Sequence, residues 1–134
     1  MSVKPTCFII MPITVPENYL PLYGNDPDHF IHVMEHLFIP AIEDAGFNPR
    51  KPIAMGGDVI QGNIIRNVEQ SDLVLCDMSI LNANVFFELG MRTSLNKSVC
   101  LVKDSFTTNL PFDTHIVNHL EYKSIAVWDI VTER

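Results

Sequence analysis

A strand followed by a polar loop and a helix is the clearest pattern in this chain, and it occupies Ser71 to Lys97. Its first part, Leu73 to Cys76, is a continuous apolar run, which is typical of a strand buried on both faces of a parallel sheet. The helix that follows has Asn84 as its predicted N-cap and carries Glu88 in its first turns. Ligands of open α/β sheets bind beyond the carboxyl ends of the strands, often at helix N-termini. Glu88 is therefore the leading candidate for a functional residue.

The alternation of strands and helices continues on both sides of this unit. Further strands are predicted at Thr6 to Met11, Phe47 to Ile53, Val99 to Val102 and Glu121 to Trp128. Pro49 and Pro52 interrupt the second of these segments, which favours an edge position in the sheet. Strands that alternate with helices predict an α/β fold with a parallel sheet.

Three helices are expected to cover that sheet. The first is expected to have a kink or a broken first half at Pro40 and to stop at Gly46, and Asp58 is expected to cap the second. The positions predicted to face inward are Phe30, Val33, Met34, Leu37, Phe38, Ala41, Ile42 and Ala45 in the first helix; Ile60, Ile64, Ile65 and Val68 in the second; and Val85, Phe86, Leu89 and Leu95 in the third. The segment before the first helix, through Asp28, is rich in proline and is predicted to be a long irregular connection of the kind that carries function. A turn is predicted at Leu110 to Asp113.

Length, charge and hydropathy narrow the classes of protein to which this chain can belong. The 134 residues predict one domain, residues 1–134. A net charge of -7, with no local cluster of Lys or Arg, argues against a nucleic-acid partner. No apolar run approaches the roughly 18 to 20 residues that cross a membrane, and no signal peptide precedes the first strand. We therefore expect no membrane partner and a cytoplasmic location. The final residues, 124–134, stop without a cap or a turn, so the domain was either cut from a longer multidomain protein or ends in a plain tail.

The cysteines and histidines predict neither a disulfide nor a metal site. Cys7, Cys76 and Cys100 each fall in a predicted strand, at spacings that fit neither a metal knuckle nor a disulfide framework, so free reduced thiols are expected. The segment from His32 to His36 spells the inverted zinc-protease pattern, but its intervening residues are needed for the core and no third ligand follows. No cofactor is expected.

Five segments, spread in order over nearly the whole chain, carry a resemblance to a known family. They are Phe8 to Ile13, Pro40 to Gly46, Ser71 to Ser79, Asn82 to Gly90, and Leu110 to Asp113 followed by Tyr122. Together they resemble the TIR-like (Toll/interleukin-1 receptor-like) nucleotide-binding family, which is related to the nucleoside 2-deoxyribosyltransferases. The block from Asp77 to Gly90 is the specific part. The resemblance implies a flavodoxin-like, three-layer sandwich with a central, mostly parallel five-stranded sheet.

The same resemblance implies a site over the strand ends. Its implied members are a catalytic glutamate, Glu88; a polar loop near the ligand, Asp77, Ser79 and Asn84; and a loop after the first strand, Met11, Pro12 and Ile13. Ala83 departs from the family pattern, which usually has a proline there. That proline stiffens the loop, so its loss bears on loop geometry and removes no chemical group.

A single carboxylate limits the chemistry that this site can perform. Cleavage of an N-glycosidic bond passes through an oxocarbenium-like transition state, which a carboxylate can stabilise or trap. In NAD the leaving nicotinamide departs as a neutral molecule, so Glu88 alone suffices, whereas a neutral base favours an added proton donor. A position near a helix N-terminus predicts an ionised Glu88, suited to a nucleophile. Asp77 is expected to hydrogen-bond the loop or a ribose hydroxyl. Arg92 is expected to pair with Glu88 or to bind a substrate phosphate.

These observations predict a TIR-like NAD glycohydrolase that cleaves the nicotinamide–ribose bond. The resemblance further implies an effector domain of a bacterial antiviral defence system, active as a homo-oligomer through TIR–TIR contacts and coupled to a fused or separate nucleotide-sensing domain. Two alternatives stay open. One is base exchange on nucleosides, as in the 2-deoxyribosyltransferases, and the other is a non-catalytic module that senses a nucleotide or assembles with a similar surface.

Overall fold

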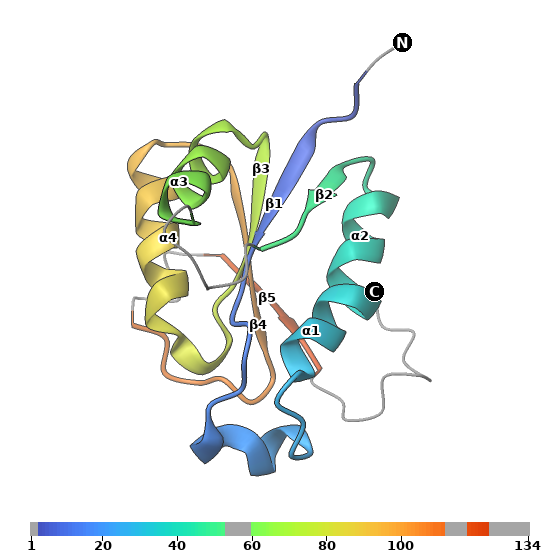
Figure 1. Ribbon diagram of the computed structural model, residues 1–134, viewed down its shortest axis with the longest axis vertical. Coiled ribbons are helices and arrows are strands. Elements are labelled where there is room, and N and C mark those ends of the chain that lie inside the picture. The colour runs from blue at the N-terminus through green and yellow to red at the C-terminus, as the bar shows by residue number, and fades with distance from the viewer. Residues whose placement is uncertain (1–2, 53–59, 112–117, 124–134) are drawn as a thin grey trace.

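A five-stranded sheet lies between two layers of helices in the computed structural model, which describes residues 3–52, 60–111 and 118–123 (Figure 1). The strands are β1 (Thr6–Ile10), β2 (Asn48–Arg50), β3 (Leu73–Asp77), β4 (Val99–Asp104) and β5 (Leu120–Tyr122). Their order across the sheet is β2-β1-β3-β4-β5, and every neighbouring pair is parallel. The predicted α/β class is confirmed, and the described sheet is entirely parallel.

The strands form apolar runs because helices cover both faces of the sheet. Successive side chains of a strand point to opposite faces, so Cys7 and Ile9 of β1 pack toward one helical layer while Phe8 and Ile10 pack toward the other. Figure 1 shows α1 and α2 on the first side and α3 and α4 on the second. Two hydrophobic clusters therefore share one sheet.

The first helical layer is one run of helix with an irregular centre. It consists of α1 (His29–Val33), a π-helical turn η2 (Met34–Phe38) and α2 (Ile39–Asp44). Pro40 lacks the N–H that would bond the carbonyl four residues earlier, and the wide turn lies directly before it. The irregularity predicted at Pro40 takes the form of this π turn, and the helix continues through it without a break. The helix ends before Gly46, whose φ of +90° suits glycine.

The second layer is formed by α3 (Ile60–Gln70) and α4 (Ala83–Ser94). Val68, Val85 and Leu89 are buried against the sheet, as predicted. Two inward assignments in this layer are wrong, because Ile65 is 47% exposed and Leu95 is 43% exposed. In the first layer the inward assignments of Ala41 and Ala45 are also wrong, because both are exposed. Leu95 is the C-cap of α4, beyond the last turn that packs on the sheet. The predictions for Asp58 and for the side chains of Ile60 and Ile64 lie outside the described residues.

The remaining sequence predictions fare as follows. Edge position is confirmed for β2, which spans three residues only. The last strand begins at Leu120, and the part of its predicted range from Ser124 onward lies outside the described residues, as do Phe112 and Asp113 of the predicted turn.

Cys7 and Cys76 are buried and Cys100 is partly buried, and all three are free thiols. Among the described helices, none is long and apolar enough to span a membrane.

Candidate active site

The strand order places one end of the sheet in the position where α/β proteins bind ligands. The chain leaves β1 toward β2 on one side, and β3 then pairs with β1 on the other side. The carboxyl ends of β1 and β3 therefore form the topological switch point. Met11, Pro12 and Ile13 follow β1 there, and Asp77 ends β3 beside them. Met11 and Pro12 are buried and Ile13 is half-buried.

Asp77 and Ser79 lie completely buried at this end and bond to each other. One carboxylate oxygen of Asp77 accepts hydrogen bonds from the backbone N–H and the hydroxyl of Ser79, at 3.0 and 2.6 Å. The other accepts from the hydroxyl of Tyr122, which arrives from β5, at 2.7 Å. Burial raises the pKa of Asp77 to about 7, although the bonds from Ser79 and Tyr122 oppose that shift. Asp77 thus holds the loop together, which was one of its two expected roles.

A second buried aspartate lies at the end of β4, and the sequence reasoning missed it. Asp104 accepts hydrogen bonds from the hydroxyl of Tyr23 at 2.6 Å, and from the hydroxyl and backbone N–H of Thr107 at 2.6 and 2.9 Å. Its own N–H donates to the hydroxyl of Ser79 at 2.9 Å, which joins the two aspartates in one network. The signal that singled out Asp77, an acid closing a buried strand, also applies to Asp104.

The loop after β3 contains a left-handed turn. In η3 (Ser79–Leu81), Ile80 has φ 55° and ψ 10°, and Leu81 has φ 52°. This region is costly for residues other than glycine, by about 1–2 kcal/mol each, and most of all for a β-branched residue. The turn is held by a hydrogen bond of 2.9 Å from the N–H of Ile80 to the hydroxyl of Thr107. Such strain clusters at functional sites.

Glu88 lies in the second turn of α4, half-buried beside the end of β3. No described residue donates a hydrogen bond to its carboxylate or forms an ion pair with it. Burial raises its pKa to about 7, from a usual value of 4.5. Its charge contributes to raising the pKa of the Cys76 thiol, after burial and Asp77, so it lies close to the face of β3. Burial therefore opposes the ionised form that the position near the helix N-terminus was expected to favour.

The raised pKa of Glu88 predicts a stability gain when the acid is removed. The folded state binds the proton more tightly than the unfolded state, so Glu88 stabilises the fold fully below pH 4.5 and loses that contribution as the pH rises through 7. We expect Glu88→Gln to be more stable than the wild type at pH 8, by on the order of 1–3 kcal/mol, and the gap to close toward pH 4. Urea denaturation at both pH values measures this; an equal gap at both would contradict the buried, desolvated carboxylate.

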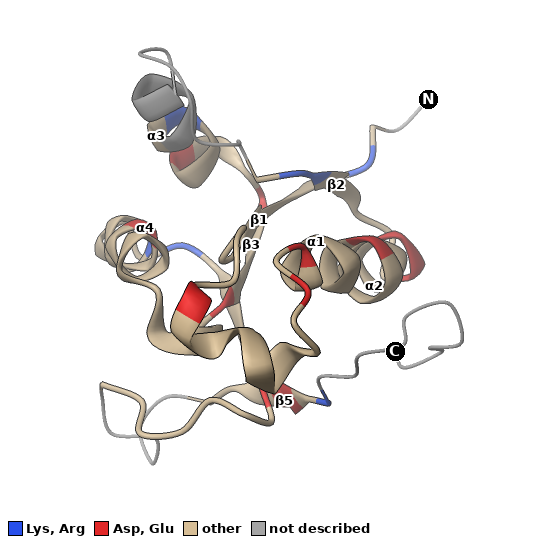
Figure 2. Cartoon of the chain, turned by 60° about the horizontal axis from the view of Figure 1, so that its bottom comes forward, with Lys and Arg blue, Asp and Glu red and all other residues tan. Residues whose placement is uncertain are grey.

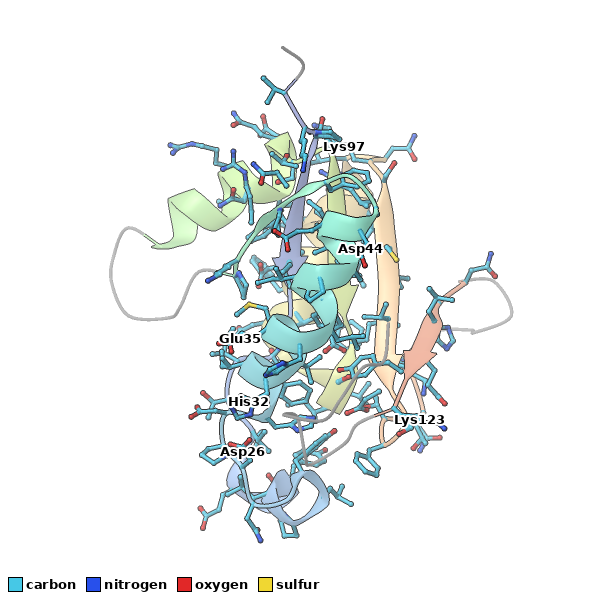
Figure 3. All side chains as sticks on the ribbon, turned by 90° about the vertical axis from the view of Figure 1, so that its right-hand side faces the viewer. Asp26, His32, Glu35, Asp44, Lys97 and Lys123 are labelled. Carbon is cyan, nitrogen blue, oxygen red and sulfur yellow. The ribbon has the colours of Figure 1, made fainter. Side chains whose placement is uncertain are left out.

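Among the described residues, the guanidinium of Arg92 forms no ion pair with Glu88, and it lies at the amino ends of β3 and β4. It is fully buried, and its guanidinium donates to the backbone carbonyls of Val68, Ser71 and Ser98 at 2.8 to 3.0 Å and, at 3.4 Å, of Asp72. These carbonyls precede β3 and β4, at their amino ends. Figure 3 shows Lys97, the neighbour of Ser98, at the opposite end of the molecule from Asp26. The expected substrate phosphate contact and the expected pairing with Glu88 are both wrong, because the planar donor fork is used to bind backbone.

Asn82, not Asn84, is the N-cap of α4. Its side-chain oxygen accepts from the N–H groups of Asn84 and Val85, at 2.9 and 3.2 Å. The side chain of Asn84 is exposed at the start of the helix. The cap therefore fixes where α4 begins, and with it the position of Glu88 along the helix.

The two asparagines make a matched pair of variants. We expect Asn82→Ala to lower the free energy of unfolding by about 1 kcal/mol, the usual cost of a lost N-cap, and Asn84→Ala to change it by less than about 0.5 kcal/mol. Thermal unfolding of the two proteins in one buffer measures the difference. Equal losses would show that the cap is shared.

A pocket of about 240 Å³ opens beside the Asp104 network. It lies between η1 (Glu17–Tyr23), which is the helical part of the long connection after β1, and the loop that follows β4. Figure 1 shows η1 below the carboxyl ends of the strands. Ile80 and Leu81 of the left-handed turn form part of its wall, whereas Glu88 does not line it. None of the residues proposed from the sequence lines this pocket.

The comparisons with known proteins concern the fold. No protein-family model and no curated protein sequence matches the chain. Among solved structures, a 2-desoxiribosyltransferase from Leishmania mexicana is similar, with a TM-score of 0.51 and 21% identity over 74% of this chain and 64% of that one. The fold is flavodoxin-like. The chain spans less than two thirds of the length of that protein.

Proposed function

We propose that this protein cleaves the N-glycosidic bond of a nucleoside or nucleotide, with Glu88 as the group that acts at the anomeric carbon. The observation that carries the proposal is the half-buried carboxylate of Glu88, without a partner among the described residues and with a pKa of about 7, in the helix that follows the switch point. Perturbed carboxylates in such positions are typical of catalytic groups. Met11, Pro12, Ile13 and Asn84 remain the proposed substrate contacts on the same rim.

Glu88 would act in its ionised form as the nucleophile. Its oxygen bonds to the anomeric carbon while the base leaves with the electrons of the N-glycosidic bond, which gives a glycosyl ester of Glu88. A second base then attacks that carbon in a transfer reaction, or water attacks it in hydrolysis, and Glu88 is released. Desolvation favours this step, because a poorly hydrated carboxylate is more reactive toward a developing cation.

The first candidate substrate is a 2′-deoxyribonucleoside, in a base-exchange reaction. The solved structure with the similar fold is a deoxyribosyltransferase, which supports this class of substrate. A neutral leaving base also needs a proton. Both oxygens of Asp77, the other acid in the block from Asp77 to Gly90, already accept hydrogen bonds from Ser79 and Tyr122, so that proton would have to come from solvent or from the incoming base.

The second candidate is NAD, and the solitary carboxylate favours it. Nicotinamide leaves as a neutral molecule and requires no acid beside Glu88. The sequence block from Asp77 to Gly90, which resembles that of TIR-like proteins, supports this reading. In that case we further propose that the protein is an effector domain that becomes active on self-assembly.

One experiment separates these candidates. The protein, at high concentration, is incubated in parallel with deoxyinosine plus free adenine and with NAD, and products are resolved by chromatography. Deoxyadenosine in the first reaction indicates base exchange, and free nicotinamide in the second indicates NAD cleavage. If neither product forms, yet NAD or a cyclic nucleotide raises the melting temperature, the protein is a binding module and the proposal is wrong.

A further inference from the structure

The pocket beside Asp104 has walls that are fixed by buried hydrogen bonds. Asp104 is completely buried and holds Tyr23 through one oxygen and Thr107 through the other. Thr107 in turn accepts the N–H of Ile80 and so holds the left-handed turn. The carboxylate of Asp104 thus fixes three residues that line the pocket: Tyr23 and Thr107 directly, and Ile80 through Thr107. Pockets that are formed before the ligand arrives bind without the cost of ordering their walls.

The lining is aromatic and uncharged. Tyr19, Tyr23 and Phe106 contribute rings, and Tyr23 meets Phe106 edge-on at 5.4 Å between ring centroids. None of the described side chains that line the pocket carries a formal charge. Figure 2, which brings this end of the molecule forward, shows no basic residue along η1. With a net charge of -7 on the whole chain, the pocket is unsuited to a phosphate or a carboxylate and suited to a neutral ring.

Apolar surface is left uncovered at the mouth of the pocket. Phe106 is 43% exposed, Leu22 52% and Leu81 38%, and all three line it. Asn109, in a left-handed conformation with φ 56°, stands at the same mouth, and its amide has no hydrogen-bond partner in the described parts of the chain. The hydroxyls of Tyr19 and Thr108 line the pocket together with this amide, and rings combined with a few polar groups are usual in a site that orients a ring by its edge.

We propose that this pocket binds the heteroaromatic base of a purine nucleoside, with the ring against Phe106 and its polar edge toward the amide of Asn109. The volume of about 240 Å³ lies below the roughly 300–1,000 Å³ of pockets for drug-sized ligands, so it fits one ring system rather than a dinucleotide. The choice of a nucleoside rests on the proposed function, and the location of the base goes beyond it: the ring would lie in this pocket, which Glu88 does not line, with its glycosidic bond directed toward Glu88.

The test measures binding of adenosine by titration calorimetry, without reference to turnover. Phe106→Ala removes the proposed stacking ring and should weaken binding about tenfold or more. Phe87→Ala is the matched control, because Phe87 is also an exposed phenylalanine but lies on α4 next to Glu88. We expect the control to bind adenosine as the wild type does. The reverse result, loss with Phe87→Ala only, would put the ring against α4 instead of against Phe106 and overturn the proposal.

A second variant fills the pocket instead of emptying it. Leu22 is exposed and lines the mouth, so Leu22→Trp should fold normally and block adenosine, and it keeps the test valid if Phe106→Ala unfolds. Wild-type protein that does not bind adenosine, or binding that survives Leu22→Trp, would also overturn the proposal.

Binding and turnover can fail separately. Glu88→Gln should still bind adenosine with wild-type affinity. If adenosine binding depends on Phe106 but no turnover is found, the proposed binding site stands and the proposed reaction is wrong. If turnover is found but adenosine binding does not depend on Phe106, the proposed reaction stands and the proposed binding site is wrong.

Discussion

Replacing Glu88 with glutamine should lower the rate of N-glycosidic bond cleavage by about 10²–10⁴-fold. Glutamine has the shape of glutamate, but its amide can neither attack the anomeric carbon nor carry the charge that offsets the oxocarbenium ion. The loss should appear in kcat, because binding of the base does not involve this side chain. Initial rates with the substrate identified by chromatography measure it.

The pH profile provides an independent check on the same residue. Since the ionised carboxylate is the reactive form and its pKa is about 7, kcat/KM for the wild type should rise with pH through 7 and then level off. Glu43→Gln is the control, because Glu43 is an exposed glutamate in the last turn of α2, which leads to the amino end of β2 and not to the ligand end of the sheet. A Glu88→Gln protein that retains wild-type activity would exclude Glu88 as the nucleophile.

Replacing Arg92 with methionine should destabilise the fold by about 3–5 kcal/mol. The guanidinium bonds carbonyls that precede β3 and β4, and methionine would leave those buried acceptors without donors. Arg92→Lys should recover little of the loss, since one ammonium group cannot reproduce a planar fork with several donors. Chemical denaturation followed by circular dichroism measures both variants.

Arg66→Met is the matched control for this prediction. Arg66 is exposed on α3, so its replacement should change the free energy of unfolding by less than about 0.5 kcal/mol. If Arg92→Met unfolded like the wild type but bound the nucleoside or NAD of the proposed reaction poorly, the original expectation of a substrate contact would be restored.

The fold could be predicted from the sequence because its strands are buried on both faces. Continuous apolar runs end sharply at Pro12 and Asp77, and proline marks the edge strand β2. The same runs also locate the ligand end of the sheet, since a parallel sheet gathers all carboxyl ends on one side. Three features of the sequence were enough to predict the α/β class: the apolar runs, the proline of the edge strand, and the order of strands and helices.

The site was harder to predict, because its side chains are positioned by contacts between distant segments. Arg92 was misassigned since four-residue spacing to Glu88 is visible in the sequence, whereas bonds to Val68 and Ser98 are not. Spacing also gave no means of choosing between Asn82 and Asn84 as the cap. The desolvation of Glu88 depends on what packs around it, so its raised pKa could be found only in three dimensions.

The two outermost strands bear on how copies of this chain could associate. Both β2 and β5 have three residues, and the middle residue of β2 is Pro49, which offers no N–H to an incoming strand. Short edge strands resist the addition of further strands and the aggregation that follows from it, and at β2 the proline adds to that resistance. An assembly of this protein, if activity requires one, should therefore be joined through the surfaces of its helices and loops, and its central sheet should stop at the boundary of each molecule.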